Sequence, residues 1–324
     1  MSNYVKIYRE PRDPRLGRNV NHDPRSWDYA FKAADLSTLT SVRHTSHIPT
    51  LNQGDLGSCT GNAAAKCISY LPFWSQPEVQ AVLSGDADAD QRYAVGIYSD
   101  ATKIDPFEGT YPPTDTGSDG LSVAKVLKTR GLISGYEHAF SLSAMLTALA
   151  DHAVIVGTEW RQDMFDPAPD GRQTITGRLA GGHEYCLDEL DVEHERVWMQ
   201  NSWGEDWGLQ GRAYFSWDDM EVLLKASGDC TIFAPLATPP PPPPPPDDQA
   251  QFVAAAKSWL SLRHSSKSHK AFAADLRKYL DTLKTDTPCT TTVPGVLRAG
   301  PVPARTAPPS SLSPIRPHEP RQPT

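Results

Sequence analysis

Gln53-Gly54-Asp55-Leu56-Gly57-Ser58-Cys59 places a glutamine six residues before a cysteine, with two glycines between them. The residues that follow, up to Tyr70, are typical of a helix, so Cys59 is expected at a helix N-terminus. The helix dipole and the free N–H groups at that end lower the pKa of a thiol and favour the attacking thiolate. A single cysteine is more often a small core residue. The stretch therefore predicts a nucleophile only if partner residues occur elsewhere.

Such partners occur downstream. Gly181-Gly182-His183 opens a strand-like run, and Asn201-Ser-Trp-Gly-Glu-Asp-Trp-Gly-Leu-Gln-Gly211 follows it. A thiol is mostly protonated at neutral pH, so an imidazole must take its proton and a third group must orient that imidazole. These stretches, in this order, resemble the papain family, whose signature is Gln, Gly-Ser-Cys, Gly-His and Asn-Ser-Trp-Gly-x-x-Trp-Gly-x-x-Gly. The resemblance covers about residues 35–224.

The resemblance implies an α+β papain-like fold with two lobes, a helical one carrying the nucleophile and an antiparallel β lobe carrying His and Asn. It implies that Cys59 is the nucleophile, that His183 is general base and then acid, and that Asn201 orients His183. Gln53 would bind the oxyanion together with the Cys59 backbone N–H, and Trp203 would shield the His183–Asn201 hydrogen bond. Neither a cofactor nor a metal is expected, and the Asp86–Asp90 run lacks the Gly and Glu of a calcium loop.

The sequence also departs from the family pattern. Thr60 follows the nucleophile where the family usually has Trp, and Leu56 stands where many members have a Cys. The Cys-Asn-Gly-Gly run that lines the substrate backbone in many members does not occur between residues 70 and 119. Glu184-Tyr185 follows His183 in place of the usual small and branched residues. Substrate specificity therefore cannot be carried over from the family.

Composition adds limits. The chain has 324 residues, 39% of them hydrophobic, which suffices for one packed domain of about 200 residues with appendages. Five cysteines, an odd number, form no disulfide framework and are expected to be reduced. The sequence has neither an apolar run of about 18 residues nor the order of a signal peptide. We expect a cytoplasmic protein by default; release by lysis or packaging in a phage particle would leave the same pattern.

The sequence predicts five regions. Residues 1–34 form an N-terminal arm, 35–236 the papain-like domain, 237–248 a proline-rich linker, 249–285 a helical hairpin and 286–324 a disordered, Pro-rich basic tail. The arm is expected to pack along the domain surface, and covering of the cleft is the alternative. Within the domain we expect helices first, at 59–70, 91–104 and 120–131, and strands second, at 153–160, 185–190, 196–200 and 211–216. Glycines 204, 208 and 211 suit a tight loop between strands, with positive φ angles or a close approach of the backbone.

The predicted function is that of a thiol endopeptidase acting on polypeptides through a thioester on Cys59. One alternative is a papain-fold binding or structural module without turnover, such as a virion component, and another is a hydrolase of cell-wall peptides. From Ala250 onward the chain has five Lys and six Arg against three Asp and one Glu, although its net charge is −8. This basic end suits an anionic partner or is a solvated tail. No membrane partner is expected, and nucleic acid is not favoured.

Overall fold

A computed structural model describes residues 6–8 and 13–237, together with the helical positions 256–258, 260, 273–274 and 276–278. The chain divides into two units, Met1–Pro239 and Pro240–Thr324. The proline run, the basic tail and most of the predicted hairpin lie outside the described residues. None of the described helices has both the length and the apolar character needed to cross a membrane.

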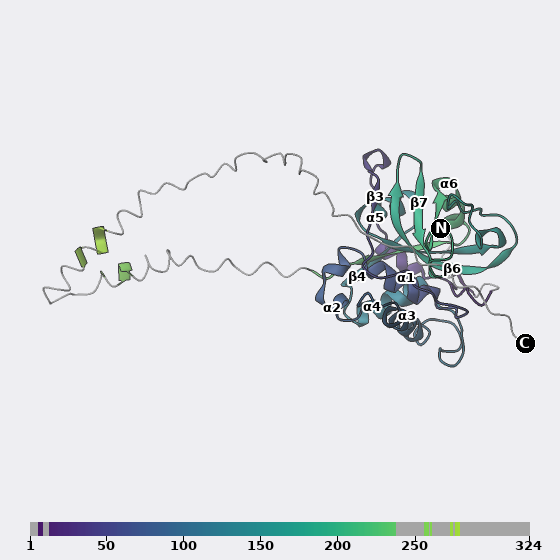
Figure 1. The fold of residues 1–324 in the computed structure, drawn as a ribbon, viewed down its shortest axis with the longest axis horizontal. Coiled ribbons are helices and arrows are strands. Elements are labelled where there is room, and N and C mark those ends of the chain that lie inside the picture. The colour runs from purple at the N-terminus through teal and green to yellow at the C-terminus, as the bar shows by residue number, and fades with distance from the viewer. Residues whose placement is uncertain are drawn as a thin grey trace, which may run out of the picture. The chain divides into compact units, whose positions relative to one another are not determined.

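The first unit combines helices with an antiparallel sheet (Figure 1). The helices are α1 (Cys59–Ile68), α2 (Pro77–Gln80), α3 (Ala87–Ala101), α4 (Gly120–Thr129), α5 (Leu142–Asp151) and α6 (Trp217–Lys225). The strands are β1 (Lys6–Tyr8), β2 (Val20–His22), β3 (Val42–Arg43), β4 (Gly135–Ala139), β5 (Val154–Arg161), β6 (Leu179–Asp191), β7 (Arg196–Gln200), β8 (Arg212–Ser216) and β9 (Asp229–Ala234).

The main sheet has the strand order β4-β9-β5-β6-β7-β8. Strand β3 pairs with Glu189 and Leu190 of β6, beyond the part of β6 that pairs with β5. All of these pairs are antiparallel. The long strand β6 lies at the centre, with Thr158 of β5 opposite His183. A second, small ladder joins β1 to β2 in the N-terminal arm, with Ile7 opposite Asn21.

Helix α1 is the centre of the helical lobe, because every one of its residues is buried. Small side chains make this possible: a Cβ on Gly61 would lie 2.3 Å from the Ala94 carbonyl oxygen of α3. Helices α1, α3 and α4 enclose one apolar cluster, which includes Ala64, Ile97 and Leu127. Figure 1 shows these helices gathered on one side of the domain, with β7 and α6 on the other.

A second apolar cluster fills the β lobe, where α5 and α6 pack against the sheet. The expectation of helices first and strands second is therefore too simple, since α5 and α6 lie in the second half of the domain. Both have a serine cap: the Ser141 and Ser216 hydroxyls accept from the N–H groups of Ala144 and Asp219, respectively. Helix α3 begins at Ala87 rather than at the predicted residue 91, because the Asp86 side chain caps it by accepting from Ala89 N–H.

Candidate active site

Cys59 is the first residue of α1, as the sequence predicts. The turn before it is held by Asp115, whose carboxylate accepts from Gly57 N–H at 2.9 Å, and by the Ser58 carbonyl, which accepts from Asn62 N–H at 3.0 Å. Cys59 is fully buried and, like the other described cysteines, is a thiol outside any disulfide. The fifth cysteine, Cys289, lies outside the described residues.

His183 lies on β6, and α1 packs against this strand. Its Nε2–H donates to the Oδ1 of Asn201 at 2.7 Å. The same Oδ1 accepts from Ser202 N–H at 2.8 Å, which fixes the orientation of the Asn201 amide. Because Nε2 carries the proton of the neutral ring, Nδ1 carries the lone pair. Nδ1 is buried and has no hydrogen-bond partner among the described residues.

Aromatic rings enclose this pair. The Trp203 and Trp160 rings both lie 4.8 Å from the His183 ring, measured between centroids. Trp207 anchors the loop, because its indole N–H donates to the Phe165 carbonyl at 2.7 Å. His183 is fully buried, and burial lowers its pKa to about 4; the hydrogen bond to Asn201 opposes this shift, and the positive charge of Arg15 adds to it. The ring is therefore neutral at pH 7 in this structure.

The loop after β7 presents Asn201 through tight backbone turns. Asn201 N–H donates to the Gly211 carbonyl at 2.8 Å, and Gly211 N–H donates to the Trp207 carbonyl at 2.7 Å. The predicted positive φ angles are confirmed at 80°, 56° and 81° for Gly204, Gly208 and Gly211. At Gly208 no side chain fits, because a Cβ would lie 2.4 Å from the Arg212 carbonyl oxygen.

Gln53 joins this loop to the start of α1. Its N–H donates to the Ser202 carbonyl at 2.9 Å, and its Oε1 accepts from the Ser202 hydroxyl at 2.6 Å. These two bonds hold the side chain so that Nε2 donates to the carbonyls of Leu56 and Arg15, at 2.7 and 2.9 Å. The amide of Gln53 therefore contacts a peptide carbonyl of the N-terminal arm.

The arm does more than pack along the domain surface, which corrects the favoured expectation. Arg18 N–H donates to the Gly182 carbonyl at 3.0 Å, directly before His183. Ser118 pairs with the arm on both sides of Arg18: its N–H donates to the Gly17 carbonyl at 2.8 Å, and its carbonyl accepts from Asn19 N–H at 2.7 Å. The Arg15 guanidinium lies 4.5 and 5.1 Å from the centroids of Phe165 and Trp203.

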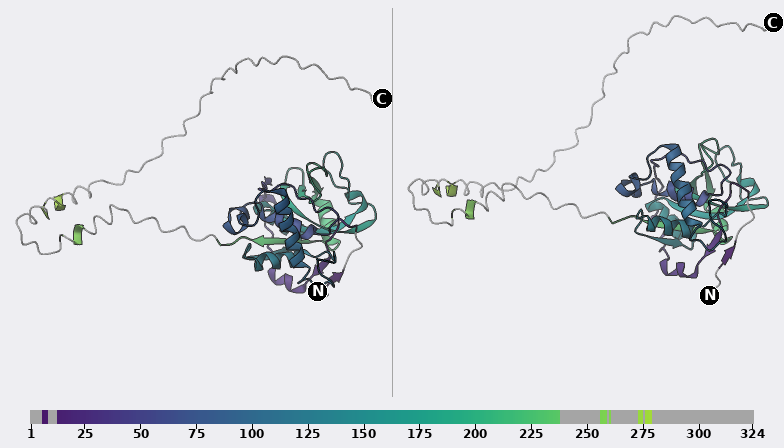
Figure 2. Two further views of the ribbon diagram at one scale, coloured as in Figure 1. Left: turned by 60° about the horizontal axis from the view of Figure 1, so that its bottom comes forward. Right: turned by 90° about the horizontal axis from the view of Figure 1, so that it is seen from below.

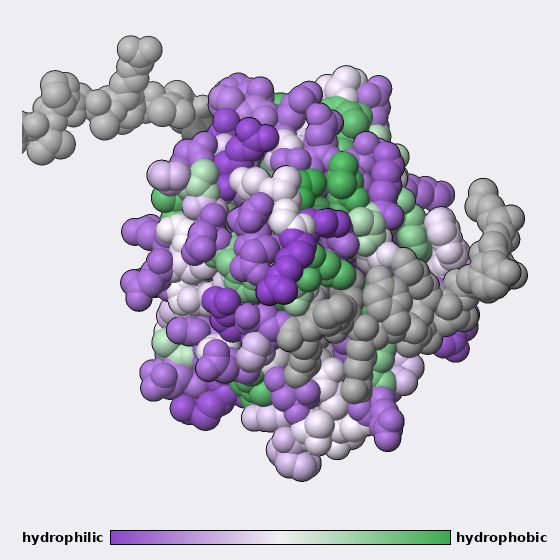
Figure 3. Space-filling view, turned by 90° about the vertical axis from the view of Figure 1, so that its right-hand side faces the viewer, coloured by the Kyte–Doolittle hydropathy of each residue, from purple (hydrophilic) through white to green (hydrophobic). Residues whose placement is uncertain are grey.

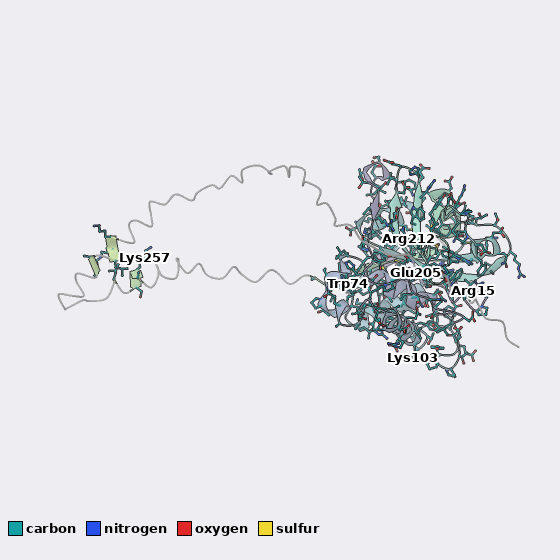
Figure 4. All side chains as sticks on the ribbon, viewed as in Figure 1. Arg15, Trp74, Lys103, Glu205, Arg212 and Lys257 are labelled. Carbon is teal, nitrogen blue, oxygen red and sulfur yellow. The ribbon has the colours of Figure 1, made fainter. Side chains whose placement is uncertain are left out.

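Gly17 allows this close approach, because a Cβ there would lie 1.8 Å from the Gly57 carbonyl oxygen. The sequence of the arm, rich in Arg, Asp and Asn, did not predict these contacts, because the pattern of residue types does not show which main-chain groups pair. Figure 2 shows the N-terminal segment, in purple, along one flank of the domain, and Figure 4 labels Arg15 on the side away from Trp74. Figure 3 shows a largely polar face with small apolar patches.

The residues that the structure describes contain no group of three or more His, Cys, Asp or Glu side chains suited to a metal ion. Asp86 and Asp90, from the discounted calcium-like run, act within the fold instead. Asp90 is buried and accepts from the backbone N–H groups of Ser84 and Gly85, at 2.8 and 2.9 Å.

The chain matches no family model, and no curated protein matches it by sequence. Among solved structures it is similar to xylellain, a cysteine protease from Xylella fastidiosa, with a TM-score of 0.53 and 17% identity over 72% of this chain and 100% of xylellain. A recombinant stem bromelain precursor matches at a TM-score of 0.40 with 15% identity, over 64% of this chain and 76% of its own. Digestive procathepsin L 3 of Tenebrio molitor larval midgut matches at 0.42 with 11% identity, over 68% and 83%.

The predicted α+β papain-like fold is thus confirmed, and it is a fold found in cysteine proteases.

Proposed function

We propose that this chain is a thiol peptidase that cleaves polypeptides through a thioester on Cys59. The observation that carries the proposal is the His183–Asn201 pair, in which the Nε2–H of His183 donates to Asn201. The basic Nδ1 of His183 is buried. His183 lies on β6, the strand against which α1 packs. This is the tautomer that a general base needs, because a neutral imidazole must accept the thiol proton at its remaining nitrogen.

The proposed reaction follows from these groups. Nδ1 of His183 takes the Cys59 thiol proton, and the thiolate attacks the carbonyl carbon of a substrate peptide bond. The oxyanion accepts hydrogen bonds from Gln53 Nε2 and from Cys59 N–H. The imidazolium then gives its proton to the departing amine as the C–N bond breaks. Water, deprotonated by the imidazole, next cleaves the thioester and releases a carboxylate and the regenerated thiol.

The N-terminal arm bonds to Gln53 and to the residue before His183. Gln53 Nε2, the proposed oxyanion donor, is bonded to the Arg15 carbonyl. His183 is fully buried, and Arg15 adds a positive charge that disfavours the imidazolium. A substrate therefore has to displace the arm, and turnover by the wild-type chain is expected to be slow.

The test is labelling with a broad epoxide inhibitor of papain-like enzymes, followed by mapping of the modified residue by mass spectrometry. Because the arm blocks access, the experiment uses the full chain carrying Gly17→Ala. Stoichiometric labelling at Cys59 that is lost in His183→Ala is expected. Cys67→Ala and His152→Ala serve as matched controls, since both residues are buried and Cys67 donates to the Ala153 carbonyl away from the site.

If Cys59 reacts no faster than Cys67, the peptidase proposal fails, and the papain-fold binding module becomes the better account. The main-chain hydrogen bonds of the arm to Ser118 and Gly182 support that alternative. Zymography on cell walls tests the third candidate, a cell-wall peptide hydrolase.

A further inference from the structure

The side chain of Arg18 is fully buried, which is unusual for an arginine. Its guanidinium forms an ion pair with Asp229 and donates to the Ser227 carbonyl at 2.5 Å. It also lies close enough to Glu184 to stabilise the negative charge of that carboxylate. Arg18 is thus held in position by its ion pair with Asp229 as well as by the main-chain hydrogen bonds of the arm.

The acidic groups around it belong to the domain. Glu184 is on β6, Asp229 opens β9, and Asp119 caps α4 by accepting from Ser122 N–H at 2.9 Å. We call these three carboxylates the acidic pocket.

Two glycines make room for this pocket. A Cβ on Gly157 would lie 2.4 Å from Glu184 Oε2 and 2.8 Å from Arg18 Nε. A Cβ on Gly120 would lie 2.6 Å from Glu184 Oε1. Any larger residue at either position would take the space of the carboxylate or of the guanidinium.

Glu184 is the most deeply buried of the three carboxylates. Both of its carboxylate oxygens are buried and have no hydrogen-bond partner among the described residues. Burial raises its pKa well above the usual value, and the negative charges of Asp229 and Asp119 add to this, whereas Arg18 opposes it. Buried carboxylates in such proximity stay charged only where a positive charge joins them, and otherwise hold a proton.

Glu184 of the acidic pocket directly follows His183 on β6. Arg18 N–H bonds to the carbonyl directly before His183, and both neighbours of Arg18 bond to Ser118. An extended substrate that uses the same main-chain partners would direct one side chain toward Glu184 and Asp229. Asp119 and Asp229 also line a cavity of about 920 Å³.

We propose that the acidic pocket selects an arginine or lysine side chain of a polypeptide substrate close to the scissile bond, and that Arg18 occupies this place in the structure. The proposal rests on the proposed peptidase function. It makes Glu184 and Asp229 specificity-determining residues, at a position where the sequence departs from the family pattern.

The test has a turnover part and a binding part, both on the full chain with Gly17→Ala to displace the arm. In the first, a positional peptide library should show Arg or Lys favoured over Met at one position near the cleaved bond. Asp229→Asn and Glu184→Gln should each reduce that preference about ten- to hundredfold, mainly through KM, as expected for loss of a charge-assisted hydrogen bond. Asp100→Asn, in an ion pair on α3, is the matched control.

The binding part needs no turnover. A fluorescent peptide with the sequence of residues 13–22 is titrated onto the Cys59→Ala, Gly17→Ala chain, and compared with a peptide carrying neutral citrulline in place of Arg18. Binding at least tenfold tighter for arginine, lost in Asp229→Asn, is expected.

The two parts separate the two proposals. Turnover without a basic preference, together with equal binding of the two peptides, would overturn the acidic-pocket proposal and leave the peptidase proposal intact. Discrimination between the two peptides without any peptide cleavage would support the pocket and contradict the peptidase proposal.

Discussion

Replacing Gly17 by alanine should release the arm from the site and increase peptidase activity. The new Cβ would lie 1.8 Å from the Gly57 carbonyl oxygen, whereas ordinary van der Waals contacts begin at 3.4 Å. The opposing group is backbone next to Cys59, so the arm has to move, by about 1.6 Å.

A movement of this size breaks the hydrogen bonds around Gly17. The bonds from Ser118 N–H to the Gly17 carbonyl and from Arg18 N–H to the Gly182 carbonyl, 2.8 and 3.0 Å long, would both exceed bonding distance. The bond from Gln53 to the Arg15 carbonyl is lost when the arm leaves. At about 1 kcal/mol for each bond, the arm is weakened by about 3 kcal/mol, which raises the fraction of open molecules roughly 100-fold.

Initial rates of fluorogenic peptide cleavage measure the effect, with thermal unfolding followed in parallel to show that the variant is folded. Gly135→Ala is the matched control, because a Cβ at Gly135 meets no atom within 4 Å. A folded Gly17→Ala chain that cleaves peptides at the wild-type rate would show that the arm does not limit access, and the reasoning above would be wrong.

Two further predictions concern stability. His183 has a pKa of about 4 in the folded chain against a usual 6.5, so the unfolded chain binds more protons between these two pH values. The contribution of neutral His183 to the free energy of unfolding is therefore complete above pH 6.5 and is lost as the pH falls through 4. Urea unfolding should therefore show the wild type losing about 3 kcal/mol relative to His183→Gln between pH 7 and pH 4, and a pH-independent difference would contradict the buried, neutral ring. Asp188→Ala should cost about 3–5 kcal/mol, because Asp188 accepts from Tyr70 at 2.8 Å and from Arg212 at 2.6 Å in the core; a loss below 1 kcal/mol in the same assay would refute this.

The sequence predicted those parts of the fold that depend on local signals. Residues 196–200 form β7 as expected, and α1 begins at Cys59 because a turn rich in glycine precedes a run of small residues. The loop from Asn201 to Gly211 was predictable because each glycine with positive φ occupies a position that other residues strain. The hydrogen bond between His183 and Asn201 was expected only from the family resemblance, since spacing alone does not bring two strands together.

The parts that the sequence did not predict depend on long-range pairing. The arm is held by main-chain bonds to Ser118 and Gly182, and residue type does not show which main-chain groups pair. Glu184 was predicted as a departure from the family pattern. Its part in the acidic pocket was not predictable, because it depends on Asp229, 45 positions later, and on Arg18, far before it in the sequence. One signal was available in the sequence. Gly157 lies inside a strand and not in a turn, and such a glycine indicates that another group approaches the backbone closely, here Glu184 and Arg18.

The arm acts on the site in three ways that reinforce one another. Its Arg15 carbonyl accepts from the amide of Gln53, its Arg15 charge disfavours protonation of His183, and its Arg18 forms an ion pair with Asp229 of the acidic pocket. Leaving the cleft would expose the His183 ring to water and remove a positive charge beside it, and both changes favour the imidazolium that pairs with a thiolate. A departing arm would also leave Glu184 and Asp229 without their cation, so a basic substrate side chain gains most at the moment when the base becomes active. Access, proton transfer and substrate preference would then depend on one segment, because Arg15 and Arg18 both belong to the arm.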